Sequence, residues 1–254
     1  MDIRRSIPAT ALFKKAICVL AIGVAFSVLG NPGAAFASAS LQISPVLIEI
    51  PAGGSVAIVD VRNEDAQAAA IQLRLFHWSQ SNGEEHLEPT QDVVASPPIA
   101  TIAPHAKLNV RVIRIGNAPV GVEDSYRLVI DQLPQSDPNG KTVVAMLLRQ
   151  VLPVFFTASS AAPPDVTWSI ARGGRGYVLK ARNSGDRRLR VSKVTLSGGV
   201  TMGGGLLGYV LGHSEMSWSI PGRRASFAPG TRVTIQGDSD QGAINAKALV
   251  SAKE

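Results

Sequence analysis

The residues best suited to chemistry in this sequence are its histidines and one cluster of acidic side chains. The four histidines are His77, His86, His105 and His213. None of them is spaced as metal ligands usually are, so they predict strand ends or surface positions rather than a metal site. Glu84, Glu85 and Glu88 crowd beside turn residues, where solvated carboxylates are the ordinary expectation.

Other sequence signatures of catalysis are also missing. Gly203, Gly204 and Gly205 are not followed by the Lys-Ser/Thr pair of a phosphate-binding loop. The sequence has no Gly-x-Ser-x-Gly nucleophile elbow. We therefore expect no catalytic residues and no metal, and an enzyme is the least favoured function class.

The first 37 residues have the order of a secretory signal. Basic residues at Arg4, Arg5, Lys14 and Lys15 precede an apolar run of about 15 residues. The small-residue site Ala35-Phe36-Ala37 follows, and predicts cleavage after Ala37, with Ala39 as the second choice. An N-terminal membrane anchor is the alternative, although the run is short for one.

Removal of this segment changes the charge and the cysteine count. The 254-residue chain has formal net charge +6, and four basic residues and Asp2 would leave, so the mature chain is near +3. This weakens any case for nucleic-acid binding. The single cysteine, Cys18, would leave as well, so packing alone must stabilise the mature chain.

The mature sequence predicts β-strands almost throughout. Short stretches of alternating apolar and polar residues recur between Gly, Pro, Asn and Asp. Asn82-Gly83 is a strong hairpin signal. The strands expected most clearly span residues 55–61, 70–78, 108–115, 126–133, 177–181 and 189–196.

This strand pattern starts twice along the chain. VDVRNEDAQAAAIQLRL and LKARNSGDRRLRVSKVTL both read as strand, Arg-Asn turn and strand. Many short strands in each half favour an all-β fold of two immunoglobulin-like β-sandwich domains in tandem. The expected divisions are a signal peptide (1–37), an N-terminal domain (38–157), a linker (158–164) and a C-terminal domain (165–254).

The stretch VVAMLLRQVLPVFF, Val143 to Phe156, is unusual in length and apolar content. It is too short for a transmembrane helix, and it is longer than most strands. The residues alone favour a strand buried on both faces within its own sandwich, and a strand used by something outside the chain is the alternative.

The order of short motifs resembles the PapD-like periplasmic pilus chaperones, and the ending of the long stretch resembles their archaic chaperone–usher branch. The motifs are the Trp78 strand end, Leu87-x-Pro89-Thr90, Ser96-Pro97-Pro98-Ile99, Ile102-x-Pro104, Val110-Arg111-Val112, Tyr126-Arg127, Leu133-Pro134, Leu152-Pro153-Val154-Phe155, Asn183-x-Gly185, Gly208-Tyr209-Val210-Leu211 and Trp218.

This resemblance implies a periplasmic protein that caps pilus subunits and delivers them to an outer-membrane usher, with no cofactor and no use of ATP. Donor-strand complementation is a known form of strand addition, in which the chaperone lends a strand to an incomplete subunit sandwich. The resemblance changes the preferred reading of the 143–156 stretch to a donated strand. Self-association of the free protein would hide so apolar a strand, and is left open.

The resemblance also implies which residues meet the subunit. Alignment with the family places Val144, Met146, Leu148 and Gln150 on the donated face, although a shift of one residue would exchange the two faces.

The family also binds the subunit's C-terminal carboxylate with two basic residues, but those positions fall on Pro45 and Pro153 here. Arg111 and Arg149 are the nearest candidates for the anchor, because arginine binds carboxylates through two parallel hydrogen bonds. A structural ion pair is the alternative for Arg111, and a solvated break in an apolar strand is the alternative for Arg149.

Two other functions remain as alternatives. A pilus subunit or adhesin would be a single incomplete sandwich with its donor extension first, which does not fit two sandwiches and a central long strand. A secreted immunoglobulin-like binding module would expose aromatic residues on loops, whereas Trp168, Tyr209 and Trp218 lie in predicted strands.

Overall fold

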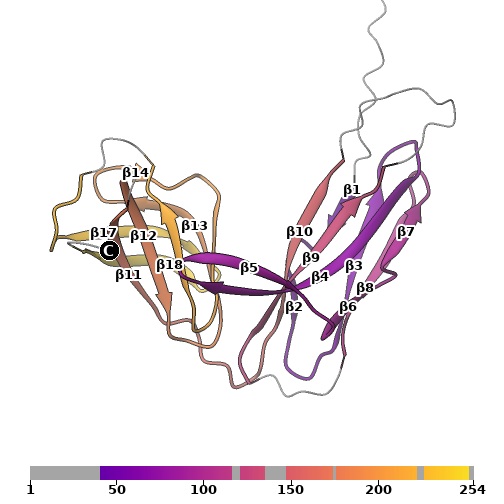
Figure 1. The fold of residues 1–254 in the computed structure, drawn as a ribbon, viewed down its shortest axis with the longest axis horizontal. Helices are drawn as coiled ribbons and strands as arrows, with labels where there is room; N and C mark the ends of the chain where they lie inside the picture. The colour runs from indigo at the N-terminus through magenta and orange to yellow at the C-terminus, as the bar shows by residue number, and fades with distance from the viewer. Residues whose placement is uncertain (1–40, 116–120, 135–146, 174–175, 222–225, 252–254) are drawn as a thin grey trace, which may run out of the picture. The chain divides into compact units, whose positions relative to one another are not determined.

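The computed structural model describes residues 41–115, 121–134, 147–173, 176–221 and 226–251, and the regular elements in these ranges are all β-strands (Figure 1). They form two sandwiches within a single unit, Ser38–Glu254. The described part of the chain contains no helix with the length and apolar content needed to cross a bilayer.

The first sandwich has two sheets. One sheet has the order β1 (Leu41–Ser44), β3 (Val56–Asn63), β8 (Lys107–Arg114) and β6 (Val93–Ser96). The other has the order β2 (Ile48–Ile50), β10 (Arg149–Phe156), β9 (Asp124–Gln132), β4 (Ala69–Ser81) and β5 (Glu84–Pro89), and β7 (Ile99–Ile102) also pairs with β4. The chain changes sheets between β1 and β2.

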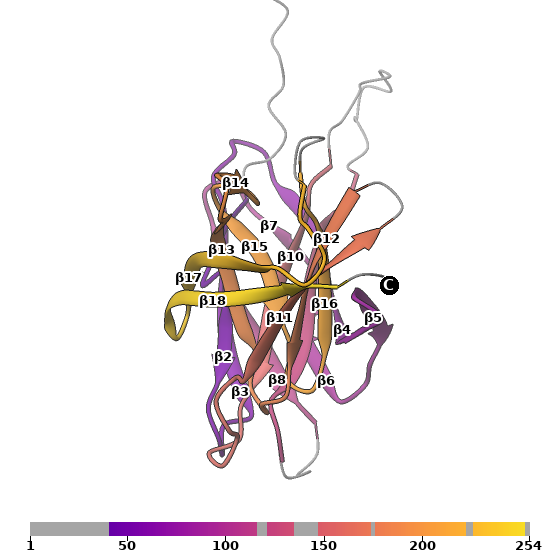
Figure 2. The same ribbon diagram turned by 90° about the vertical axis from the view of Figure 1, so that its left-hand side faces the viewer.

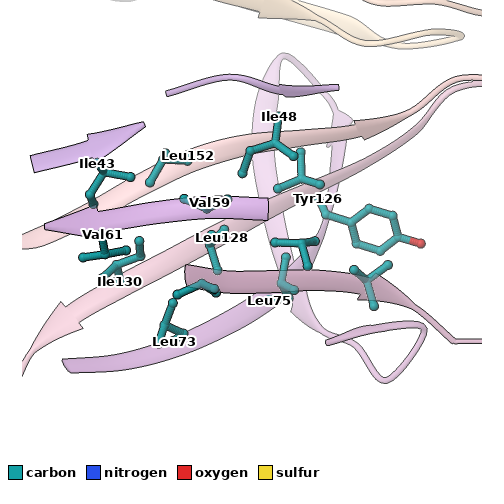
Figure 3. Packing of buried hydrophobic residues seen from close by; sticks show 14 of the residues in the cluster. Ile43, Ile48, Val59, Val61, Leu73, Leu75, Tyr126, Leu128, Ile130 and Leu152 are labelled. Atoms are coloured by element: carbon teal, nitrogen blue, oxygen red, sulfur yellow. The ribbon is translucent and has the colours of Figure 1, made fainter. Parts of the chain in front are cut away.

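Alternation of apolar and polar residues explains why these segments are strands. In β3, Val59 and Val61 are buried, and in β8, Val110 and Val112 are buried, while their polar neighbours face water. Leu152 of β10 packs into the same core, opposite side chains of the other sheet (Figure 3). The core is therefore filled from both sheets.

The second sandwich is built from one sheet that encloses a separate core. Its order is β14 (Val200–Thr201), β13 (Leu189–Leu196), β17 (Arg232–Ser239), β18 (Gly242–Val250), β11 (Val166–Gly173), β12 (Gly176–Asn183) and β16 (Glu215–Ser219), with β15 (Leu206–Val210) also paired to β13. β17 and β18 form the yellow hairpin in Figure 2. The core takes side chains from strands throughout this order.

The two Arg-Asn turns of the repeated sequence pattern have matching geometry. Asn63 Nδ2 donates to Gln67 O at 2.7 Å, and Asn183 Nδ2 donates to Arg187 O at 2.7 Å. Each Nδ2 also donates to two further backbone carbonyls at 3.1 to 3.2 Å. Each Oδ1 accepts the backbone N–H two residues later at 3.0 Å. Both side chains are buried, so a fully satisfied asparagine fixes the same turn in each sandwich.

The sequence-based strand predictions agree with the structure to within a few residues. The predicted hairpin at Asn82-Gly83 is also present, because both residues have positive φ, 54° and 79°. The clearest difference concerns the long apolar stretch: its strand, β10, begins only at Arg149, and Leu147 and Leu148 precede it. Residues 143–146 lie outside the described residues. The domain limits and the linker 158–164 stay predictions.

Candidate functional site

β10 has an edge that is only partly covered. It pairs with β9 along its whole length, but β2 pairs only with Val154 to Phe156. Within the described ranges, no strand pairs with the β2 side of β10 from Arg149 to Pro153. An uncovered edge of this kind can accept another strand.

The hydrogen-bond pattern shows which backbone groups point to this edge. Gln132 N donates to Leu148 O at 3.0 Å on the β9 side, and Thr157 N donates to Ile50 O at 3.0 Å on the β2 side. Because backbone groups alternate in direction along a strand, the odd-numbered residues direct theirs away from β9. The N–H and C=O groups of Arg149 and Val151 therefore face the uncovered edge.

Pro153 fits this edge without loss of pairing to β9. As an odd-numbered residue its missing N–H would face the β2 side, where pairing starts one residue later at Val154. Proline is tolerated at such edge positions because no ladder bond is removed.

The side chains around this edge are apolar and partly exposed. Leu152 and Val154 point into the core, whereas Val151 is 45% exposed on the opposite face. Leu147 and Leu148 are 45% and 40% exposed. Since two consecutive leucines are both exposed, the alternation of β10 cannot be extended through them to decide which earlier side chains share a face.

The predicted donor residues are only partly placed. Val144 and Met146 lie outside the described residues. Leu148 is exposed just before β10. Gln150 is half-buried, on the face of Leu152, and its Nε2 donates to Leu41 O at 3.3 Å. The choice of the donated face therefore stays a prediction.

Arg149, one anchor candidate, already has an acidic partner. Its Nε donates to Asp131 Oδ1 at 2.5 Å, and Arg74 donates to the other oxygen of Asp131 at 2.5 Å. Burial alone would raise the pKa of Asp131, but the hydrogen bonds from the two arginines lower it overall. These residues line a shallow hollow together with Leu147 and Leu148, so Arg149 sits beside the start of the free edge.

Arg111, the other anchor candidate, lies in the opposite sheet. It is exposed on β8, between Ile58 of β3 and Ser96 of β6. No ion pair with its side chain is found among the described residues. The structure thus leaves Arg111 available to a ligand, but does not bring it together with Arg149.

An aromatic cluster links the two sandwiches beside the end of the free edge. Trp78 and Phe155 come from the first sandwich, and Tyr209 and Leu211 come from the second. Trp78 and Tyr209 meet edge to face, with ring centroids 5.6 Å apart. Trp78 is buried, and its Nε1 has no hydrogen-bond partner within the described part of the chain.

Arg127 is a cation in this cluster that the sequence analysis did not select as an anchor. Its guanidinium lies 3.5 Å from the centre of the Trp78 ring. It donates only weakly to Glu85, at 3.3 Å. Burial lowers the pKa of Arg127, and the Glu85 charge opposes this shift. The sequence offered one indication of this position. Arg127 follows the core residue Tyr126, so the alternation of β9 directs its side chain away from the first core.

Arg127 also lies directly opposite Pro153 in the β9–β10 ladder. Opposite residues in an antiparallel pair have side chains on the same face, with Cβ atoms about 5 Å apart. The guanidinium therefore occupies the face that a basic side chain at position 153 would have used.

Two polar contacts hold the sandwiches together around this cluster. Gln80 is buried, its Nε2 donates to Tyr209 O at 2.9 Å, and its Oε1 accepts from Leu211 N at 2.9 Å. At the tip of the same hairpin, Gly83 O accepts from Ser217 N at 3.2 Å. The β4–β5 hairpin thus pairs with backbone of the second sandwich at two places.

A buried ion pair forms a further contact between the sandwiches. Arg188 Nη1 donates to Glu123 Oε2 at 2.5 Å, and Arg188 N donates to Glu123 Oε1 at 2.9 Å. Arg188 also pairs with Glu49, and its guanidinium lies 3.8 Å from the centre of the Phe155 ring. Removing one partner of such a buried pair is costly, because the other charge is left without compensation.

The described residues hold no group of three or more His, Cys, Asp or Glu side chains that could bind a metal ion. His77 packs against Tyr126, and His213 pairs with Asp186 at 2.7 Å. The acidic cluster lies on β5, a fully exposed strand, rather than in a turn.

Residues 40–161 match the family model of the pili and flagellar-assembly chaperone, PapD N-terminal domain. No curated protein matches the sequence. The match covers the region that contains most of the motifs resembling the PapD-like chaperones.

Several solved structures share the fold. One is the CsuC–CsuE chaperone–tip adhesion subunit pre-assembly complex from archaic chaperone–usher Csu pili of Acinetobacter baumannii, with 24% identity, 83% of this chain and 99% of that chain covered, and a TM-score of 0.66. Another is the SafB chaperone in complex with the SafA pilin of Salmonella enterica, with 16% identity, coverage of 85% and 98%, and a TM-score of 0.60. The E. coli chaperone DraB has 17% identity, coverage of 84% and 100%, and a TM-score of 0.56. The predicted all-β, two-domain fold is confirmed.

Proposed function

We propose that this chain is a PapD-like pilus chaperone, a member of a non-enzymatic family, and that it captures pilin-like subunits by donor-strand complementation. The single observation that carries this proposal is the uncovered edge of β10 from Arg149 to Pro153. Both solved complexes named above pair a chaperone of this fold with a pilin or tip adhesion subunit.

The physical basis is that the chaperone and the subunit each have a strand edge with unpaired backbone groups, which can hydrogen-bond to each other. A subunit that lacks its last strand exposes an apolar groove and unpaired backbone groups, which are costly in water and prone to aggregation. The edge of β10 offers N–H and C=O groups from Arg149 and Val151, and the exposed Leu147, Leu148 and Val151 offer apolar area beside it. Joining the two edges forms backbone hydrogen bonds and buries both apolar surfaces.

We also propose Arg127 as the residue that receives the subunit's C-terminal carboxylate. It lies opposite Pro153, where the free edge ends, and its only ion-pair partner among the described residues is Glu85 at 3.3 Å. An incoming carboxylate can replace this weak pair with two parallel hydrogen bonds. Arg149 and Arg111 remain the candidates from sequence, and the experiments below separate the three.

The wider setting of the function follows from the family and from the N-terminal segment. The predicted signal would export the chain, so the subunit is met in the periplasm and passed to an outer-membrane usher. No ATP is needed in this scheme, because folding of one subunit against the next provides the free energy for release.

Co-expression tests the proposal. The chain should be produced with the pilin-like proteins encoded beside it, and the periplasmic extract purified through a tag on the subunit. We expect a one-to-one complex with a subunit that aggregates or is degraded when expressed alone. A chain that stays alone, whether as a monomer or as a self-associated form, and rescues no subunit would contradict the proposal.

A further inference from the structure

Glu85 lies where the proposed carboxylate site meets the second sandwich. It belongs to β5 and shares one face of the β4–β5 hairpin with Gln80, which lies directly opposite it. On that face, Arg127 extends over the ring of Trp78 and donates to both carboxylate oxygens of Glu85, at 3.3 and 3.4 Å. Both bonds are longer than the usual hydrogen bond between charged groups, so Arg127 holds Glu85 only weakly.

Lys180 approaches the same hairpin from the second sandwich. It lies on β12 directly opposite Ser217 of β16, so these two side chains share a face. Ser217 contacts the tip of the hairpin, because its backbone N–H donates to Gly83 O at 3.2 Å. Lys180 is therefore one strand away from the hairpin tip, and it lines a hollow of about 500 Å³ together with Glu84 and Glu85.

Glu85 connects the two cations. It bonds to Arg127, which does not line the hollow, and it lines the hollow with Lys180. Within the described ranges, Lys180 forms no ion pair, and Glu85 forms one only with Arg127. Lys180 is also partly buried, whereas Arg182 on the same strand is exposed. Opposite charges attract more strongly where water is partly excluded, so Lys180 is well placed to hold Glu85 once Glu85 leaves Arg127.

We propose that Lys180 receives Glu85 when the C-terminal carboxylate of the subunit displaces Glu85 from Arg127. This inference rests on the proposed role of Arg127 as the anchor. Two carboxylates beside one guanidinium repel each other, and this repulsion would weaken capture. With Lys180 in place, the incoming carboxylate pairs with Arg127 and Glu85 pairs with Lys180, so each anion has its own cation.

This exchange of partners also links the two sandwiches. Glu85 belongs to the first sandwich and Lys180 to the second, so the new ion pair adds a contact between them when a subunit binds. The contact forms beside the hydrogen bond from Ser217 N to Gly83 O, which already ties the hairpin tip to the second sandwich. Binding of the carboxylate would thus tighten the hairpin against β16.

A double-mutant cycle tests the exchange in the purified protein. The probes are the pilin-like subunit that co-purifies with it and the same subunit without its C-terminal residue, and calorimetric titration measures the affinity for each. Lys180→Gln should bind the intact subunit about fivefold more weakly, near the upper limit for a partly exposed ion pair. The truncated subunit should bind as before. In a Glu85→Gln background, Lys180→Gln should change the affinity for the intact subunit by less than about twofold, because no carboxylate is displaced.

Three matched variants separate the exchange from charge in general. Glu84→Gln changes a carboxylate that lines the same hollow but has no bond to Arg127, so Lys180→Gln should keep its fivefold effect in that background. Lys247→Gln removes an exposed cation from β18 and should keep the wild-type affinity. Lys180→Arg keeps the charge and should also keep the affinity. The melting temperature of each variant should equal that of the wild type.

The outcomes distinguish this inference from the anchor on which it rests. If Arg127→Ala still distinguishes the intact from the truncated subunit as the wild type does, both the anchor and the exchange are overturned. If Arg127→Ala removes that difference, the anchor holds and Lys180 decides the exchange. Wild-type affinity in Lys180→Gln, or an equal loss with and without Glu85→Gln, would then overturn the exchange alone.

Discussion

At the scale of single residues, Arg127 is held by an aromatic ring rather than by a strong ion pair. Its guanidinium lies 3.5 Å from the centre of the Trp78 ring, and Glu85 is 3.3 Å away. Stacking occupies only the flat face of the guanidinium, so an N–H donor at its edge can exchange the weak bond to Glu85 for a bond to a ligand. Arg149 differs, since Asp131 already occupies its Nε at 2.5 Å.

We predict that Arg127→Ala weakens binding of an intact subunit by about 2 kcal/mol, roughly thirty-fold, which is the usual loss of a hydrogen-bonded charge. A subunit lacking its C-terminal residue should lose much less, because its carboxylate no longer reaches the site. Calorimetric titration of a groove-filling subunit measures both. Arg111→Ala and Arg149→Ala are the matched controls, and a selective loss in either would move the anchor to that residue.

Arg127 could not be selected as an anchor from sequence alone, although Tyr126-Arg127 is one of the motifs that resemble the family. Its role depends on Trp78, which lies on another strand, and on Tyr209, which lies in the other sandwich. No local sequence pattern indicates contacts with residues so distant along the chain. Pro153, by contrast, could be interpreted from its chemistry alone, because a residue without an N–H suits an uncovered edge.

At the scale of elements, β10 is both a core strand and an open edge. Its even-numbered side chains fill the first core, and its odd-numbered backbone groups face away from β9. The strand is therefore already ordered in the free protein, so its residues lose little conformational entropy when a subunit pairs with it.

We predict that Met146→Asp and Leu148→Asp each abolish subunit capture, because an unpaired carboxylate in the subunit's apolar groove is costly. The free variants should keep the wild-type circular dichroism and melting temperature. Pull-down of a tagged subunit measures capture. Val151→Asp is the matched variant for the other face: loss of capture in this variant alone would assign donation to the Val151 face.

At the scale of the whole molecule, the second sandwich is tied to the first by side chain and backbone together. The Gln80 amide satisfies both a carbonyl and an N–H of the segment Tyr209–Leu211. The tip of the same hairpin approaches so closely that a Cβ at Gly83 would lie 1.9 Å from Ser217 Oγ. Only glycine fits there.

We predict that Gln80→Glu lowers the free energy of unfolding by about 2 to 3 kcal/mol. The buried carboxylate can still accept from Leu211 N, but it cannot donate to Tyr209 O, so two acceptor oxygens face each other there. Urea unfolding at neutral pH measures this change. Gln42→Glu, an exposed substitution of the same kind on β1, should change stability by less than about 0.5 kcal/mol. Equal stability of the two variants would exclude a structural role for the Gln80 amide.

The sequence by itself determined the strands, their grouping into two sandwiches and the family resemblance. These features depend on local alternation, on turn residues such as Asn82-Gly83, and on motif order, all of which can be read along the chain. The repeated Arg-Asn turn could be recognised for the same reason, since Asn63 and Asn183 make their first bonds within four residues.

Only the tertiary structure decided which edge is open and which cations have partners. The edge of β10 is uncovered because β2 reaches only Val154, which depends on where a distant segment of the chain ends. Arg149 is engaged by Asp131 and Arg127 is stacked on Trp78, through contacts between strands that are separate in sequence. Such contacts follow from register and packing, and a one-residue shift of register would change them all.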